Sequence, residues 1–174
     1  MKRIPWKRTA FAVLVALCTC WSSPAIEPAK TCTFAHKDGQ DLMLDYYPAA
    51  PGSETTFMGK EKPAIIFVFG GGFIGGSRKE SASWFEMLSK EGYKVFSIDY
   101  RLGLRGKKDK GLGFVKNLKD AIDMAVEDLF SATSYIVENA DSFGVSPDNL
   151  VVSGSSAGAI TVLQADWTLS NGLP

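Results

Sequence analysis

The sequence predicts an α/β fold with a mostly parallel sheet and an antiparallel N-terminal hairpin. Short, continuously apolar runs alternate along the chain with longer segments whose apolar residues recur every three or four positions. This pattern is typical of parallel strands joined by helices. Near the N-terminus, two extended runs flank Lys37-Asp38-Gly39, and an Asp-Gly pair favours a tight antiparallel turn. The 174 residues are 45% hydrophobic and 22% charged, which suits one domain with a substantial core.

The elements after the hairpin follow from hydrophobic periodicity. Apolar runs without alternation indicate strands buried on both faces. Ser81 or Ser83 is expected to cap the first helix, and Gly92 to follow its end. We predict, in order, a hairpin within 31–49, a polar loop at 51–62, a strand at 63–72, a helix at 81–92, a strand at 93–101, a helix at 113–139, a strand at 149–154 and a helix at 157–169.

The longest predicted helix, residues 113–139, shows one apolar face. Its members fall three or four residues apart, which is the spacing of neighbours on one side of a helix. They are Val115, Leu118, Ile122, Val126, Leu129, Ala132 and Ile136.

The N-terminal segment, residues 1–25, resembles a secretory signal peptide rather than part of the core. Basic residues precede a short apolar run, and small residues follow it, so cleavage after Ala25 is expected. The apolar run is too short for a stable membrane span. We therefore expect a secreted or periplasmic protein whose domain covers residues 26–174.

Cysteine placement leaves a second possibility for export. Cys18 or Cys20 could carry a lipid, but Leu17 and Thr19 precede them where a small residue is usual. Cys32 would be the only cysteine after cleavage, so it is expected to be a lone thiol. With 19 basic and 19 acidic residues and no basic stripe, nothing indicates a nucleic-acid partner.

The stretch Gly154-x-Ser156-x-Gly158 lies between a predicted buried strand and an apolar helix. This pattern in this context predicts a nucleophile elbow, a sharp turn that exposes a serine. The glycines on either side have no Cβ to meet the crossing strand and helix. The N-terminus of the following helix and the backbone N–H of Ala157 would favour an oxyanion beside Ser156.

The glycine-rich loop Phe69–Ser77 follows the first predicted parallel strand and admits two interpretations. In one, the backbone N–H groups of Gly71 and Gly72 join Ala157 in an oxyanion hole. In the other, Gly70-x-Gly72-x-x-Gly75, with Asp99 after the next strand, forms a dinucleotide-binding fingerprint. The second interpretation requires a helix that begins within the loop, whereas the helical pattern begins several residues later.

Four motifs in order resemble the α/β-hydrolase superfamily, most closely esterases of the hormone-sensitive-lipase and carboxylesterase type. They are "GGGF", "SIDYRL", "FGVSPDNLVVSGSSAG" and the helix behind the elbow. The resemblance covers residues 31–174, the N-terminal half or somewhat more of such a domain. It implies an α/β-hydrolase fold, C-terminally incomplete, with Ser156 as nucleophile and the loop glycines as oxyanion donors.

By this resemblance, the expected activity is hydrolysis of carboxylic esters, such as acetyl or feruloyl groups on small molecules or polysaccharides. A secreted peptidase of the same fold and an inactive fragment are alternatives. No metal or organic cofactor is implied. The chain departs from the family at Phe69, where a histidine is usual.

The rest of a catalytic triad is missing from this pattern. Family members place the acid and the histidine after the serine, yet the only histidine is His36. It lies on the N-terminal hairpin, where a surface or packing role is expected. Asp166 lies in the helix behind the elbow and is poorly placed to act as the acid. We also expect an exposed sheet edge beyond Val151-Val152.

Overall fold

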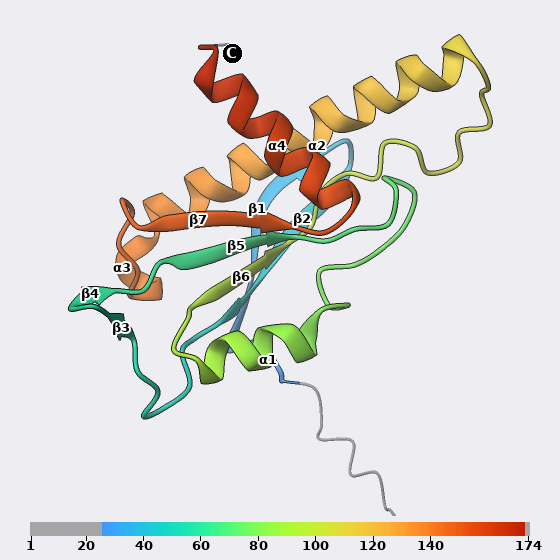
Figure 1. Ribbon diagram of the computed structural model, residues 1–174. Coiled ribbons are helices and arrows are strands. Elements are labelled where there is room, and N and C mark those ends of the chain that lie inside the picture. Colours follow the sequence, from blue (N-terminus) through green and yellow to red (C-terminus); the bar gives the residue numbers. More distant parts are fainter. Residues whose placement is uncertain (1–25, 173–174) are drawn as a thin grey trace, which may run out of the picture.

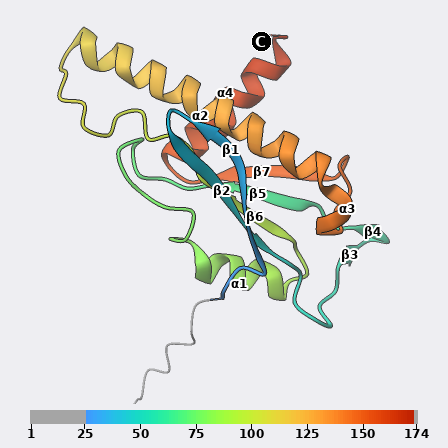
Figure 2. The same ribbon diagram turned by 180° about the vertical axis from the view of Figure 1, so that it is seen from behind.

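The computed structural model describes residues 26–172. Five strands form one sheet in the order β1-β2-β6-β5-β7, with α1 on one face and α2 and α4 on the other (Figure 1). The view from behind shows the same layers (Figure 2). The strands of this sheet are β1 (Lys30–Lys37), β2 (Gln40–Tyr47), β5 (Ala64–Val68), β6 (Val95–Ile98) and β7 (Leu150–Gly154). The helices are α1 (Ala82–Lys90), α2 (Leu112–Glu138), α3 (Ala140–Phe143) and α4 (Ala157–Ser170).

The N-terminal hairpin forms as predicted. β1 and β2 pair antiparallel, and Lys37 lies opposite Gln40. Asp38 and Gly39, the two residues between the strands, have φ angles of 50° and 74°, as a type I′ turn requires. β2 pairs antiparallel with β6, whereas β6, β5 and β7 are parallel neighbours. Because β1 runs opposite to β2, every strand of this sheet except β2 points the same way, so the mostly parallel sheet is confirmed.

The segment predicted as a plain polar loop, residues 51–62, contains a small hairpin of its own. β3 (Thr56–Phe57) and β4 (Lys60–Glu61) pair antiparallel and form a separate sheet. Met58 and Gly59 join them with φ angles of 52° and 76°, again a two-residue turn. The prediction was wrong here because strands this short show no alternating pattern.

α1 begins and ends close to the predicted residues, but its N-terminus lacks the predicted side-chain cap. Ser81 occupies the N-cap position, yet its side chain makes no capping hydrogen bond. Gly92 follows the helix with a φ angle of 82°. A Cβ on Gly92 would lie 1.9 Å from the carbonyl oxygen of Glu54, so this glycine both ends the helix and lets another loop approach.

The apolar face predicted for α2 packs against the core except at Val115, which is exposed. Ala121 and Ala125, which were not predicted, are also buried, and Gly103 approaches so closely that a Cβ there would lie 2.7 Å from Ala121. The predicted residues that are buried are Val126, Leu129, Ala132 and Ile136. Those that are half-buried or exposed are Val115, Leu118 and Ile122.

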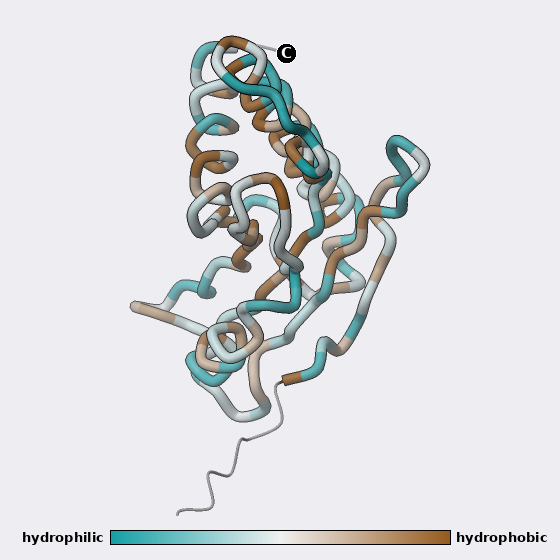
Figure 3. The backbone as a smooth tube through the Cα atoms, turned by 90° about the vertical axis from the view of Figure 1, so that its right-hand side faces the viewer, coloured by the Kyte–Doolittle hydropathy of each residue, from teal (hydrophilic) through white to brown (hydrophobic). Residues whose placement is uncertain are grey.

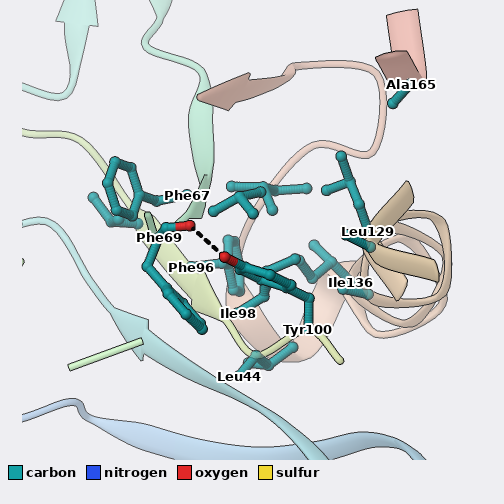
Figure 4. Packing of buried hydrophobic residues seen from close by; sticks show 14 of the residues in the cluster. Leu44, Phe67, Phe69, Phe96, Ile98, Tyr100, Leu129, Ile136 and Ala165 are labelled. Carbon is teal, nitrogen blue, oxygen red and sulfur yellow. Dashed lines mark hydrogen bonds between the residues drawn. The ribbon is translucent and has the colours of Figure 1, made fainter. Parts of the chain in front are cut away.

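The main core lies between the sheet and α2. Ile98 of β6 and Leu129 and Ile136 of α2 belong to this core and are fully or almost fully buried, and Figure 4 shows part of the cluster. Hydrophobic and hydrophilic residues alternate along the coils of the helices (Figure 3), as expected for elements with one buried side. This core fixes the ends of β5, β6 and β7, from which the candidate site is built.

Within residues 26–172, β7 pairs only with β5 and forms one edge of the sheet. Val151 and Val152 are 47% and 38% exposed, so the expected exposed edge is confirmed. Neighbouring α4 also carries exposed apolar side chains: Ile160, Leu163, Trp167 and Leu169. Among the described residues, no helix has the length and apolar character needed to cross a membrane.

The predicted signal peptide, with its cleavage after Ala25 and the alternative lipid sites at Cys18 and Cys20, lies outside the described residues. Those expectations stay predictions. Cys32 lies on β1, half-buried and without a disulfide.

Candidate active site

Ser156 lies at the turn between β7 and α4, as the elbow pattern predicts. Its φ and ψ angles are 50° and −117°, and its side chain is exposed. A non-glycine residue with positive φ is uncommon and costs about 1–3 kcal/mol, so it persists only where its surroundings enforce it. The strained turn holds this serine at the carboxyl-terminal edge of the parallel strands.

The two glycines around Ser156 are sterically required. A Cβ on Gly154 would lie 2.5 Å from the carbonyl carbon of Gly158. A Cβ on Gly158 would lie 2.1 Å from the carbonyl oxygen of Val68, at the end of β5. Real Cβ atoms essentially never come this close to backbone, so the predicted reason for the glycines is confirmed.

The glycine loop lies directly beside this turn. β5 and β7 are parallel neighbours in which Val68 pairs with Gly154, and the N–H of Ser155 donates to the carbonyl of Val68 at 3.2 Å. Two residues after Val68, a Cβ on Gly70 would lie 3.2 Å from the Cβ of Ser156. The loop after β5 and the elbow after β7 therefore meet at one edge of the sheet.

The amides predicted as oxyanion donors are not used within the fold. Gly71 accepts hydrogen bonds from the N–H groups of Ile74 and Gly75, both at 3.1 Å, which closes the loop into a tight turn. Throughout residues 26–172, the N–H groups of Gly71 and Gly72 donate to no acceptor. Ala157 opens α4, so its N–H has no partner within the helix. These three donors are free to bind an external group.

Phe69, which stands where the family has histidine, is buried and packed. Its ring stacks on Tyr100, with centroids 4.4 Å apart. The Tyr100 hydroxyl donates to the carbonyl of Phe69 at 3.0 Å (Figure 4). Burial, with a smaller contribution from Glu80, raises the pKa of Tyr100 to about 12, so this hydroxyl keeps its proton across the physiological range.

The alternative dinucleotide fingerprint does not have the geometry that it requires. α1 begins at Ala82, well beyond the loop glycines, so the helix that follows the loop does not begin within it, as this kind of pyrophosphate site requires. Asp99 is committed to the fold, because it pairs with Arg78 at 2.8 Å and accepts the N–H of Met43. Burial raises the pKa of Asp99 despite these partners.

The structure does not bring His36 or Asp166 to the elbow. His36 lies on β1, four strand positions from β7, which corresponds to roughly 19 Å at the usual strand spacing. Its Nδ1 lies 2.8 Å from Asp41 Oδ1 on the surface. Asp166 is exposed on α4. Both sequence-based expectations, that neither residue completes a triad here, agree with this placement.

Sequence reasoning missed the buried ion pair between Arg101 and Asp128. The N–H and Nε of Arg101 donate to Asp128 at 2.8 and 3.0 Å, and Asp128 has no exposed surface. Burial lowers the pKa of Arg101, but hydrogen bonds to Asp128, Asp38 and Glu127 outweigh that effect and raise the pKa overall. An arginine three residues after a buried strand, and an acidic residue within the apolar stripe of a helix, were the available clues.

In the described part of the chain, no cluster of three or more acidic, cysteine or histidine side chains could hold a metal ion. The arrangement instead offers an exposed, strained serine beside three free amides. Comparison with known proteins shows that residues 54–168, or 115 of the 174, match one family. The chain belongs to the BD-FAE family.

Relatives of this BD-FAE chain include esterases and lipases. It is 32% identical over 107 residues to gut esterase 1 of Caenorhabditis briggsae, covering 60% of this chain and 18% of that protein. It is 28% identical over 128 residues to lipase 2 of Moraxella sp. (strain TA144), covering 72% and 26%. The chain therefore spans about a fifth to a quarter of the length of these relatives.

Solved structures confirm that the BD-FAE chain has an α/β-hydrolase fold. The apo form of Thermogutta terrifontis esterase 2 is 28% identical with a TM-score of 0.58, and the match covers 78% of this chain and 44% of that one. Structures of the same esterase with butyrate and with propionate bound match equally in identity, with TM-scores of 0.56 and 0.58. Another similar structure is of that esterase phosphonylated by sarin, with a TM-score of 0.58.

Proposed function

We propose that this chain carries the nucleophile and oxyanion hole of a serine carboxylesterase. The observation that carries the proposal is the juxtaposition of Ser156, in its strained turn, with a loop whose Gly71 and Gly72 amides are free. Strained, exposed residues cluster at sites of catalysis. Membership of the BD-FAE family and the esterases among its relatives support ester hydrolysis as the reaction class.

In the proposed mechanism, Ser156 Oγ attacks the carbonyl carbon of the ester while a base takes its proton. The carbonyl oxygen becomes an oxyanion, which the N–H groups of Gly71, Gly72 and Ala157 stabilise. The alcohol then leaves, and water hydrolyses the acyl-serine. The base is not His36, because that residue lies on the opposite edge of the sheet.

The proposed substrate is a carboxylic ester, either with a short acyl group such as acetyl or with the larger aromatic feruloyl group. The butyrate and propionate complexes of the similar esterase support short acyl groups. No contact in the described residues favours a peptide bond over an ester.

Covalent capture tests the nucleophile directly. With a p-nitrophenyl phosphonate ester, Ser156 Oγ bonds to phosphorus, p-nitrophenolate leaves and the serine proton goes to solvent. After prolonged incubation of the 174-residue chain, intact-mass measurement should show one adduct on Ser156. Ser155→Ala, which alters the exposed neighbour, should still be captured, whereas Ser156→Ala should not. An adduct that persists in Ser156→Ala would refute the assignment.

We also propose that the protein is exported, on the basis of the N-terminal segment described above. N-terminal sequencing of protein recovered from an expressing cell tests this proposal. A mature chain that begins near Ile26 is expected. A start at Cys18 or Cys20 with an attached lipid would instead establish membrane anchoring.

A further inference from the structure

The segment that follows β6 holds the glycine loop at three points. The Tyr100 hydroxyl donates to the carbonyl of Phe69 at 3.0 Å. The N–H of Leu104 donates to the carbonyl of Phe73 at 3.0 Å, and Arg105 Nε donates to that of Ile74 at 3.1 Å. All three bonds engage carbonyls, so they orient the loop without using the amides of Gly71 and Gly72.

Tyr100 is the member of this set closest to the elbow. Besides Phe69, its hydroxyl lies 3.5 Å from the carbonyl oxygen of Gly70, the residue whose missing Cβ faces Ser156. A peptide unit is planar, with its C=O and N–H pointing in opposite directions. Drawing the Gly70 carbonyl toward Tyr100 therefore turns the N–H of Gly71 away from Tyr100. A hydrogen bond to a carbonyl also polarises the N–H of the same peptide unit.

The aromatic contacts around Tyr100 fix its ring firmly. It is stacked on Phe69 and meets Phe73 edge-on, with centroids 6.1 Å apart. All three side chains are at most 3% exposed. Phe73 has a φ angle of 61°, so the loop holds a strained residue of its own, packed against the same tyrosine.

We propose that Tyr100 is a positioning residue for the oxyanion donors. Its ring and hydroxyl hold residues 69–71 so that the N–H of Gly71 faces the Ser156 side of the loop. In this chain, the Phe69–Tyr100 pair supplies the anchoring for a loop that begins with phenylalanine. This inference rests on the proposed function, because it assigns a task to amides that the proposal uses as oxyanion donors.

The test compares Tyr100→Phe with a matched control, Tyr46→Phe. Tyr100→Phe keeps the ring and removes only the hydroxyl. Tyr46 likewise stacks on a phenylalanine, Phe96, and its hydroxyl donates to the buried carbonyl of Phe143 at 2.8 Å. Both variants lose one buried hydrogen bond, so a merely structural role predicts similar losses in melting temperature and no other difference.

The first measurement is ¹⁵N relaxation of the 174-residue chain, read at Gly71 and Gly72. Order parameters near 0.85 are expected in the unmodified protein and in Tyr46→Phe, and values below about 0.6 in Tyr100→Phe. Unchanged order parameters in Tyr100→Phe would overturn the inference. This measurement does not depend on whether Ser156 reacts.

The second measurement is the rate of phosphonate capture at Ser156. We expect Tyr100→Phe to lower the limiting rate about tenfold, with an unchanged half-saturating concentration, since misplaced oxyanion donors affect the transition state more than binding. Tyr46→Phe should stay within about twofold of the unmodified chain. If even the unmodified chain is not captured, the proposed function fails, and the relaxation measurement still decides the role of Tyr100.

Discussion

At the scale of single residues, the elbow depends on backbone that approaches too closely for side chains. Ser156 has a positive φ angle, and Gly158 packs against the end of β5. Gly158 is buried and its N–H donates to the carbonyl of Ser155 at 2.8 Å. The surrounding sheet and helix offset the energetic cost of the positive φ angle at Ser156. Sequence patterns detect the positions of Gly154 and Gly158 well, because only a residue without a Cβ fits where the backbone approaches this closely.

Gly158→Ala should be strongly destabilising, because its Cβ would lie 2.1 Å from the Val68 carbonyl oxygen and force β5 and α4 apart. We expect a loss of about 2–4 kcal/mol in the free energy of unfolding, measured by urea denaturation. Gly75→Ala is the matched control, since nothing lies within 4 Å of its Cβ position and its φ angle is not positive. It should change stability by no more than about 0.5 kcal/mol. Equal effects of the two substitutions would contradict this account.

The buried tyrosine beside the loop should make stability sensitive to alkaline pH. The folded-state pKa of Tyr100 is raised to about 12 by burial, above the unfolded value of about 10. A pKa raised on folding gives stability that is complete below pH 10 and is lost as pH rises through 12. Unfolding free energies measured across this range should fall, and the fall should be shallower in Tyr100→Phe. Identical slopes in the two proteins would show that Tyr100 does not titrate as described.

At the scale of elements, one ion-pair cluster joins three separate parts of the fold. Arg101 follows β6, Asp128 lies on α2, and Asp38 lies in the β1–β2 turn. Arg101 Nη1 lies 2.8 Å from Asp38 Oδ2, and Lys37 Nζ lies 3.1 Å from Asp128 Oδ1. The cluster fixes the start of the segment that holds the glycine loop, so it links the hairpin and α2 to the site.

Asp128→Asn should leave the guanidinium of Arg101 buried without its main counter-charge. Removing one partner of a buried pair costs about 3–5 kcal/mol, which should appear as a large fall in the urea midpoint. Asp120→Asn on the same helix is the control: Asp120 pairs with Lys116 at 2.9 Å, and both are exposed. Its midpoint should not change measurably. A mild effect of Asp128→Asn would mean that the remaining carboxylates satisfy Arg101.

At the scale of the whole molecule, the sheet separates the elbow from the only histidine of the sequence. Ser156 follows β7 at one edge, and His36 lies on β1 at the other. A serine hydroxyl without a base is a weak nucleophile at neutral pH. The described residues therefore place Ser156 beside the glycine loop and far from His36.

The 174-residue chain should hydrolyse a short-chain aryl ester no faster than Ser156→Ala does. Loss of triad function lowers turnover by several orders of magnitude, and the oxyanion hole alone recovers little of it. Release of p-nitrophenolate from p-nitrophenyl acetate measures the rate, with His36→Ala as a further variant. Rapid turnover abolished by both Ser156→Ala and His36→Ala would make His36 the base and contradict the strand order that separates them.

The fold was predictable to the extent that its elements carry local patterns. The hairpin and the long helix were predicted close to their observed bounds, since Asp38-Gly39 and the apolar periodicity are encoded over a few residues. The strands predicted at 63–72 and 93–101 end earlier, at Val68 and Ile98, because the apolar run continues into the loops that follow them. The burial of Ala121 in α2 was not predicted, because it depends on the close approach of Gly103. The two-residue strands around Met58-Gly59 are too short to show any period.

The sequence by itself predicted the elbow and the glycine loop, because each depends on residue identity and order along the chain. Only the tertiary structure decided which side chains support the site. The hydrogen bond between Tyr100 and Phe69 joins residues 31 positions apart in the sequence, and the one between Arg101 and Asp128 joins residues 27 positions apart. Contacts of this kind depend on how strands and helices pack, and a local pattern holds no information on packing between distant segments.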